Sequence, residues 1–244
     1  EYQLGDMMQA PDTRVGPRGA APRITFGSVE RTGRTEDHAI ASDVTWREAT
    51  DALDRDNPRL VASMDGRTEA CAETLSNRRE VEFANLLFDP AQHGGSFACS
   101  GGSLWSDPAA DPLKQIREAI RTMPVKPTHA VFGPLAWEAF SAHPRVVKAA
   151  GSFTGEGTID ATAARRLLRG VEPVVGESMV NTARPGEPVE LTEAFGPHCA
   201  LVKVETAPNP GRTFGWGFTF QKGTRKTWTG YNPAPGAMGV YDIK

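Results

Sequence analysis

The stretch Leu104-Trp105-Ser106-Asp107-Pro108-Ala109-Ala110-Asp111-Pro112 decides how this chain folds. Its two Asp-Pro steps hold the backbone extended and turned, because a proline disfavours helical conformation in the residue before it. Asp111 stands where a helix N-cap belongs, and Pro112 takes the first helical position, where its missing N–H costs nothing. Apolar residues then recur at helical spacing as far as Thr122. We therefore expect a helix here and a boundary between an irregular first part and a regular α/β second part.

Composition sets the broad class of the protein. The 244 residues are 39% hydrophobic and 23% charged, enough to bury a real core in one large domain or two modest ones. The 25 glycines and 19 prolines show no repeat and predict many turns and extended arms. A net charge of −3 disfavours a dedicated nucleic-acid binder, and no apolar run is long enough to span a membrane. Cys71, Cys99 and Cys199 lie far apart, which predicts free thiols in a reducing cytosol.

The first 46 residues predict extended structure without a core of its own. Glu1–Pro22 carries no periodic apolar face and is expected to be an arm that lies on something else. Arg23–Thr32 and Glu36–Trp46 are interpreted as the strands of a long hairpin with the polar tip Arg31-Thr32-Gly33-Arg34-Thr35. An isolated two-stranded hairpin is not stable in water. Something outside the hairpin should therefore cover it.

A long helix is predicted, because the sequence favours helix from about Val61 to Phe88; the core of that stretch, Arg67–Phe88, would be about 33 Å long at 1.5 Å per residue. Its centre, residues 76–80, is very polar, and Asp89-Pro90 should end it. A helix with a charged centre is typical of one that lies across a surface. Its expected apolar stripe consists of Ala72, Leu75, Phe83, Leu86 and Leu87.

The second part of the chain predicts alternating short helices and strands. Prolines and glycines punctuate it, so each element should be short. Pro173 should place its strand at a sheet edge. The expected elements are a strand at 128–133, helices at 134–141, 143–150 and 160–168, an edge strand at 171–176, a strand at 199–205, an aromatic-rich strand at 213–221, and extended segments at 226–231 and 240–243.

No arrangement of residues predicts catalysis, a metal or a cofactor. The five histidines share no metal-binding spacing, and no Gly-x-Ser-x-Gly elbow is present. The Gly-Ser loop at 91–103 lacks the strand, helix and Lys-Ser/Thr pair of a phosphate loop. Asp107 and Asp111 could form a carboxylate pair, but beside prolines they are better explained as turn and cap residues.

The segment from Trp105 to Ile116 resembles the junction found in major capsid proteins of tailed bacteriophages. In one branch of that family a long helix leads into a Trp-Ser-Asp-Pro step and then into a helix. The further matches keep the family's order and run as far as Gln221: Ala130–Gly133 leading to His143–Val146, Val174–Gly176, Phe195-Gly196 before Ala200–Val204, and Phe214–Phe220. Each match is weak alone, and their shared order makes them specific.

The resemblance implies an α+β protein with the Hong Kong 97-type capsid fold. That fold has an N-terminal arm, an extended hairpin loop, a peripheral domain with a long spine helix and an axial α/β domain. The implied boundaries are 1–22 for the arm, 23–52 for the extended hairpin loop, 53–106 for the peripheral domain with the spine helix, 107–205 for the axial domain and 206–244 for the return to the peripheral domain. Neighbouring subunits would then cover the arm and the hairpin, so Arg31, Thr32, Gly33, Arg34 and Thr35 are the candidate inter-subunit contact.

The resemblance also implies a function without an enzyme activity, a cofactor or a metal. The expected protein is the structural head protein of a tailed bacteriophage, which self-assembles as hexamers and pentamers into an icosahedral shell around double-stranded DNA. Its expected partners are other copies of itself, portal, scaffold and cement or decoration proteins, and non-specifically packaged DNA, with no membrane. The expected location is the virion capsid, assembled in the cytoplasm of the host bacterium.

Two other functions remain open on the sequence. One is a related shell with different cargo, as in an encapsulin or a gene-transfer-agent subunit. The other is a cytosolic α/β enzyme using the glycine-rich loops, which predicts a compact molecule with one deep pocket. The extended first 50 residues or so disfavour the enzyme.

Both ends of the chain depart from the family pattern. The start at Glu1 fits either proteolytic maturation or simple trimming, and the end at Lys244 leads us to expect a last strand missing from the peripheral sheet. Relatives that cross-link subunits do so through Lys and Asn, and no position here matches well enough to assign that role.

Overall fold

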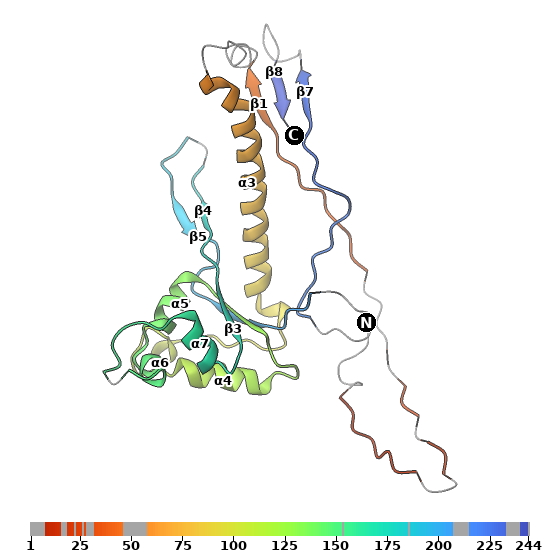
Figure 1. The fold of residues 1–244 in the computed structure, drawn as a ribbon, viewed down its shortest axis with the longest axis vertical. Coiled ribbons are helices and arrows are strands. Elements are labelled where there is room, and N and C mark those ends of the chain that lie inside the picture. The colour runs from red at the N-terminus through yellow and green to blue at the C-terminus, as the bar shows by residue number, and fades with distance from the viewer. Residues whose placement is uncertain are drawn as a thin grey trace.

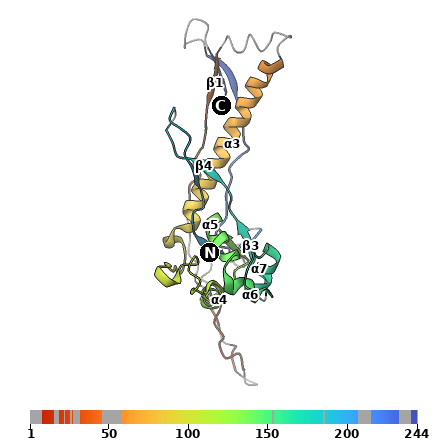
Figure 2. The same cartoon turned by 90° about the vertical axis from the view of Figure 1, so that its left-hand side faces the viewer.

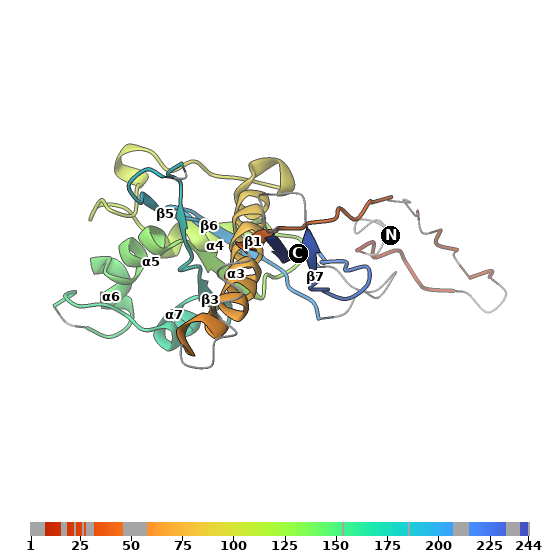
Figure 3. The same cartoon turned by 90° about the horizontal axis from the view of Figure 1, so that it is seen from above.

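The computed structural model describes residues 8–15, 19–21, 23–25, 27, 32–45, 58–152, 154–184, 186–206, 215–232 and 240–243. One long helix, α3 (Pro58–Phe88), runs between a small sheet at its N-terminal end and an α/β body at its C-terminal end (Figures 1 and 2). An extended N-terminal segment leaves this body and reaches far to one side, as the view from above shows (Figure 3). The chain is therefore elongated, with extended parts that lie outside its cores.

Helix α3 begins at Pro58, a few residues before the helix-favouring stretch that starts at about Val61. Its 31 residues span about 47 Å at 1.5 Å per residue. It ends at Phe88 as predicted, because Asp89 caps a short 3₁₀ helix, η1 (Pro90–Gln92), by accepting a hydrogen bond from the Ala91 N–H at 2.9 Å. This hydrogen bond, with one from the Gln92 amide, holds the pKa of Asp89 below its ordinary value.

The predicted apolar stripe of α3 is only partly correct. Ala84 and Leu87 are fully buried, whereas Phe83 and Leu86 are about half exposed. The buried face is narrow because α3 lies on one face of a sheet and is not enclosed in a bundle.

The sheet under α3, which we call the central sheet, has the strand order β3-β2-β6. Strand β2 (His129–Phe132) pairs in parallel with β3 (Glu172–Val175) and antiparallel with β6 (Cys199–Val202). The parallel pair needs a crossover, which three helices supply: α5 (Pro134–Ser141), α6 (Pro144–Ala149) and α7 (Ala161–Leu167). Pro173 lies in β3 at the edge of the sheet, as predicted.

Strand alternation divides the apolar residues of the central sheet between two cores. Ala130 and Phe132 face the helices, where they pack with Phe140, Val146 and Leu168. On the other face, Val131, Ala200 and Val202 join Ala84, Leu87 and Phe195 beneath α3. The sheet is therefore buried on both faces, as its short and almost wholly apolar β2 strand requires.

The stretch Leu104–Pro112, which we call the junction, connects α3 to the helical side of the central sheet. After the 3₁₀ turn η2 (Gly101–Ser103), the Trp105 ring packs near Phe132 and Phe140, with centroids 6.2 and 5.8 Å away. The Trp105 indole N–H donates to the Gln115 side-chain oxygen at 2.6 Å, and the Gln115 amide donates to the Ser103 carbonyl at 3.2 Å. Gln115 lies in α4 (Pro112–Thr122), so these bonds attach the junction to the helix that follows it.

Asp107 and His143 fix the same junction to α6. Asp107 accepts from the Ala109 N–H at 2.8 Å, as a turn residue should. His143, only 2% exposed, caps α6 by accepting from the Arg145 N–H at its Nδ1. Its Nε2 therefore carries the proton and donates to the Asp107 carbonyl at 3.1 Å. The interpretation of Asp107 as a turn residue is confirmed.

Asp111 caps α4, and its loss has a predictable cost. Its carboxylate accepts from the Lys114 N–H at 3.0 Å and pairs with the Arg145 guanidinium at 3.4 Å. We expect Asp111→Ala to lower the free energy of unfolding by about 1 kcal/mol, mostly through the lost cap because the ion pair is largely exposed. Asp111→Asn keeps a capping oxygen and should stay within about 0.5 kcal/mol of the original in urea unfolding. Equal losses in both variants would assign the effect to the ion pair and contradict this account.

A second sheet, the distal sheet, lies beside the N-terminal end of α3 (Figure 1). It has the order β1-β8-β7, from β1 (Ser42–Thr45), β8 (Val240–Ile243) and β7 (Thr229–Asn232), all antiparallel. The Arg67 guanidinium on α3 donates to the Asp43 carbonyl of β1. This sheet therefore joins segments near the two ends of the chain.

The distal sheet corrects the predicted hairpin. In the described parts of 23–41 there is no strand, and Ser42–Thr45 pairs with β8 and not with a segment at 24–30. The two predicted strands have few apolar residues to bury against one another, whereas Val44 in β1 is fully buried. The described residues of 23–41 are thus outside any strand, and Arg31 of the predicted tip lies outside the described residues.

Two further differences concern the C-terminal half. A hairpin at β4 (Met179–Asn181) and β5 (Leu191–Glu193) was not predicted, because its strands are short and mixed in polarity. The predicted aromatic strand at 213–221 is wrong in its described part, since residues 215–221 form no strand. Trp216 instead donates its backbone N–H to the Lys203 carbonyl at 2.8 Å and packs edge-on against Phe83.

Candidate inter-subunit surfaces

The total accessible surface is far larger than a compact monomer of this mass would have. The chain exposes 17985 Å², whereas a compact 26.3 kDa protein exposes about 10,600 Å² on the usual scaling with mass. The excess follows from the elongated shape and the extended segments (Figures 1 and 3). Surface of this kind is typical of subunits that complete their burial against other chains.

The N-terminal segment contributes much of this surface. Every described residue from Met8 to Gly27 is exposed, and the apolar side chains of Met8, Val15 and Ile24 are about half exposed. Residues 32–39 are also all exposed, and a Cβ added at Gly33 would meet nothing within 4 Å. Thr32, Gly33, Arg34 and Thr35, the described residues of the predicted tip, therefore extend into solvent.

The β4–β5 hairpin is a second uncovered projection. It is anchored at its base, where the Ser178 hydroxyl donates to the Glu80 carboxylate at the polar centre of α3. Beyond that base Met179, Val189 and Leu191 are 48%, 70% and 57% exposed. The two apolar strand residues lie on one face, because Met179 pairs with Glu193 and Leu191 with Asn181. Sequence reasoning missed this projection because its strands are short and mixed in polarity.

The distal sheet offers an open edge. Strand β7 pairs with β8 on one side, and no other described strand lies on its outer side. Unpaired strand edges expose a row of N–H and C=O groups that can pair with another chain. The edge, the N-terminal segment and the β4–β5 hairpin are three separate surfaces that a neighbouring subunit could bury.

The described residues form no cluster of the side chains that usually bind metals. Among the described residues no three His, Cys, Asp or Glu side chains lie together as a metal site, and no helix there is long and apolar enough to cross a membrane. Asp111 is engaged as a helix cap and lies at one end of an open basic hollow.

All three cysteines are free thiols, as predicted. Burial raises the pKa of Cys199 well above its ordinary value, and the neighbouring Cys99 raises it further. Burial also raises the pKa of Cys99, whose Sγ lies 3.8 Å from the Gln115 side-chain oxygen. Both groups are therefore protonated and weakly nucleophilic at neutral pH.

All three comparisons with known proteins find phage or phage-related proteins. A family model described as phage major capsid protein E matches residues 93–186. The chain is 28% identical, over its whole length and 78% of the relative's, to the major capsid protein of Pseudomonas phage JBD67. Its fold is similar to the crystal structure of a phage-related protein from Bordetella bronchiseptica, with a TM-score of 0.67, 21% identity, and coverage of 95% of this chain and 75% of the other.

These similarities agree with the geometry. The matched residues 93–186 contain the junction, the helical side of the central sheet and the first strand of the β4–β5 hairpin. The N-terminal segment and the distal sheet lie outside that region, and the β4–β5 hairpin lies across its end. The family match and the relative support a phage major capsid protein with a structural role, in an α+β fold similar to that of the phage-related protein.

Proposed function

We propose that this chain assembles, as hexamers and pentamers of itself, into an icosahedral shell of the Hong Kong 97 type that encloses the double-stranded DNA of a tailed bacteriophage. The observation that carries the proposal is the exposure of separate described segments, which include the described residues of 8–39 and the apolar side chains of the β4–β5 hairpin. Many contacts made at once by each subunit give a stable shell even where each contact is weak.

The parts of the chain fit the proposed fold in order. Residues 1–22 act as the arm and 23–52 as the extended loop, with α3 as the spine helix of the peripheral domain. The central sheet with α4–α7 corresponds to the axial domain at 107–205, and the distal sheet belongs to the peripheral domain to which 206–244 return. The open edge of β7 supports a peripheral sheet that continues into a neighbouring chain.

The proposed contact of the loop tip rests on exposure. Thr32, Gly33, Arg34 and Thr35 have no cover from the described residues of their own chain. A neighbouring subunit that covers them would bury the two arginine stems, Arg31 and Arg34, along its surface. Portal, scaffold and cement proteins are further proposed partners, and assembly is proposed to take place in the host cytoplasm before the shell becomes the virion capsid.

Electron microscopy tests the proposal directly. We expect the protein, co-expressed with the scaffold of its phage and purified by size-exclusion chromatography, to form shells, capsomer rings or tubes in negative stain. Nuclease-protected DNA in shells from infected cells would support the phage head, whereas protein cargo without DNA would indicate an encapsulin-like shell. Monomers alone, even with scaffold present, would contradict the proposal.

A further inference from the structure

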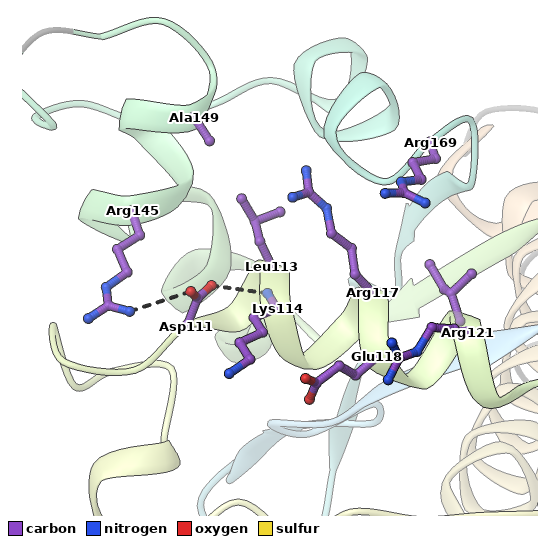
Figure 4. A pocket seen from close by; sticks show the side chains of 10 residues that line it. Asp111, Leu113, Lys114, Arg117, Glu118, Arg121, Arg145, Ala149 and Arg169 are labelled. Atoms are coloured by element: carbon purple, nitrogen blue, oxygen red, sulfur yellow. Dashed lines mark hydrogen bonds and ion pairs between the residues drawn. The ribbon is translucent and has the colours of Figure 1, made fainter.

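An open pocket of about 570 Å³ lies between α4, α6 and the turn after α7 (Figure 4). Its apolar lining consists of Leu113, Ile120 and Ala149. The pocket is also lined by five cationic and two acidic side chains: Lys114, Arg117, Arg121, Arg145, Arg169, Asp111 and Glu118. The lining thus carries a formal charge of +3, five positive minus two negative, within a chain whose net charge is −3.

Most of this positive charge is not compensated within the pocket. Asp111 pairs with Arg145 at 3.4 Å, but no carboxylate of the described residues forms an ion pair with Lys114, Arg117 or Arg169. In Figure 4, Arg117 and Arg169 extend toward the same space from α4 and from the turn after α7. Arg117 donates to the Leu167 carbonyl at 3.1 Å, which orients its guanidinium and leaves its other N–H groups open.

The backbone holds Arg169 in an unusual conformation at this site. Its φ of 59° makes it the one non-glycine residue with positive φ in the described part of the chain. Such a position after a helix usually belongs to glycine, because a Cβ is disfavoured there. The Gly170 N–H bonds to the Arg165 carbonyl at 2.8 Å and Lys126 bonds to the Arg169 carbonyl at 2.9 Å, so the turn is fixed from both sides. Disfavoured residues of this kind concentrate where a side chain has a task.

We propose that this pocket binds a phosphate group. A phosphate carries up to two negative charges and several acceptor oxygens, so it can bond the guanidinium groups of Arg117 and Arg169 together. A ligand with a single carboxylate would leave most of the positive charge uncompensated. The pocket already contains one carboxylate of its own, Asp111, which forms an ion pair with Arg145. The phosphate can come from a nucleic-acid backbone or from a free polyphosphate. This inference does not depend on the proposed shell, because the pocket lies within one chain.

Calorimetric titration of the unassembled full-length protein with inorganic tripolyphosphate at low ionic strength tests the site. We expect Arg117→Gln/Arg169→Gln to weaken binding about tenfold or more, since two charge-assisted bonds are lost. A second pair, Lys114→Gln/Arg121→Gln, should also weaken binding and keeps the structural bond from Arg117 to Leu167. The control pair Arg79→Gln/Arg184→Gln removes the same charge from exposed positions outside the pocket and should change affinity less than about twofold.

The outcomes distinguish binding in the pocket from non-specific electrostatic attraction of the anion to the protein surface. Equal weakening by the control pair, or unchanged binding by both pocket pairs, would overturn the proposal. So would citrate binding as tightly as tripolyphosphate, because the pocket would then prefer carboxylates, as on an acidic protein segment. Competition by a short DNA duplex would identify the nucleic-acid backbone as the source, and its failure would identify free polyphosphate; both support the phosphate site.

Discussion

Replacing Arg31–Thr35 by Gly-Gly should lower the yield of assembled shells by about tenfold or more, because a contact repeated in every subunit is lost throughout the shell. The subunit itself should fold normally. Thr32, Gly33, Arg34 and Thr35 are exposed and lie far from both cores, so their removal exposes no buried apolar surface. Shell yield by sedimentation and negative stain, beside far-UV circular dichroism of the unassembled protein, measures the two effects separately.

A second variant distinguishes the length of the tip from its positive charge as the property that assembly needs. Arg31→Ser/Arg34→Ser keeps the length of the loop and removes both of its cations. If reach is the essential property, this variant should assemble better than the shortened loop, and if ion pairs are essential the two should fail alike. Full assembly of the shortened loop would show that the tip is no inter-subunit contact.

Gly133→Ala should be the most damaging single methyl addition among the described glycines of the central sheet. The added Cβ would lie 1.7 Å from the Gly196 carbonyl oxygen and 2.8 Å from that of Phe195. Both are backbone atoms, so the end of β2 and the loop before β6 must separate, which breaks the 2.8 Å bond from the Gly133 N–H to the His198 carbonyl. We expect a loss of about 3 kcal/mol or more in the free energy of unfolding, from overpacking and the lost hydrogen bond together.

Gly66→Ala is the matched control and should act in the opposite direction. A Cβ at Gly66 meets nothing within 4 Å, and the residue lies inside α3. Alanine there should stabilise the helix by up to about 1 kcal/mol. Urea unfolding of the two variants measures the difference, and similar effects at both positions would refute the packing argument.

Local chemistry made the second part of the chain predictable. Pro134 and Pro144 start helices at their first positions, Asp111 and Asp160 cap helices through side-chain oxygens, and Gly170 follows the end of α7. Each of these signals acts within four residues, so the bounds of α5 were predicted to the residue. The sequence and the class of protein predict that there is no catalytic or metal site, and this stays a prediction.

Contacts between distant residues made the rest unpredictable. Ser42–Thr45 pairs with Val240–Ile243, almost 200 positions away, and nothing local distinguishes that pairing from the expected hairpin. The basic pocket likewise depends on three separate elements, since its cations belong to α4, α6 and the turn after α7. Sequence spacing indicated only that Arg169 lies near a helix end.

Local signals were enough to predict the junction at 104–112 and most of the short elements that follow it, because caps, prolines and strand alternation act over a few residues. Contacts between distant segments set which face of α3 is buried, which strand β1 joins, that the β4–β5 hairpin projects, and that Arg117 and Arg169 line one pocket. Those features depend on contacts between segments that are far apart in the sequence. Their free energy comes from burial and pairing between residues that the linear sequence keeps far apart.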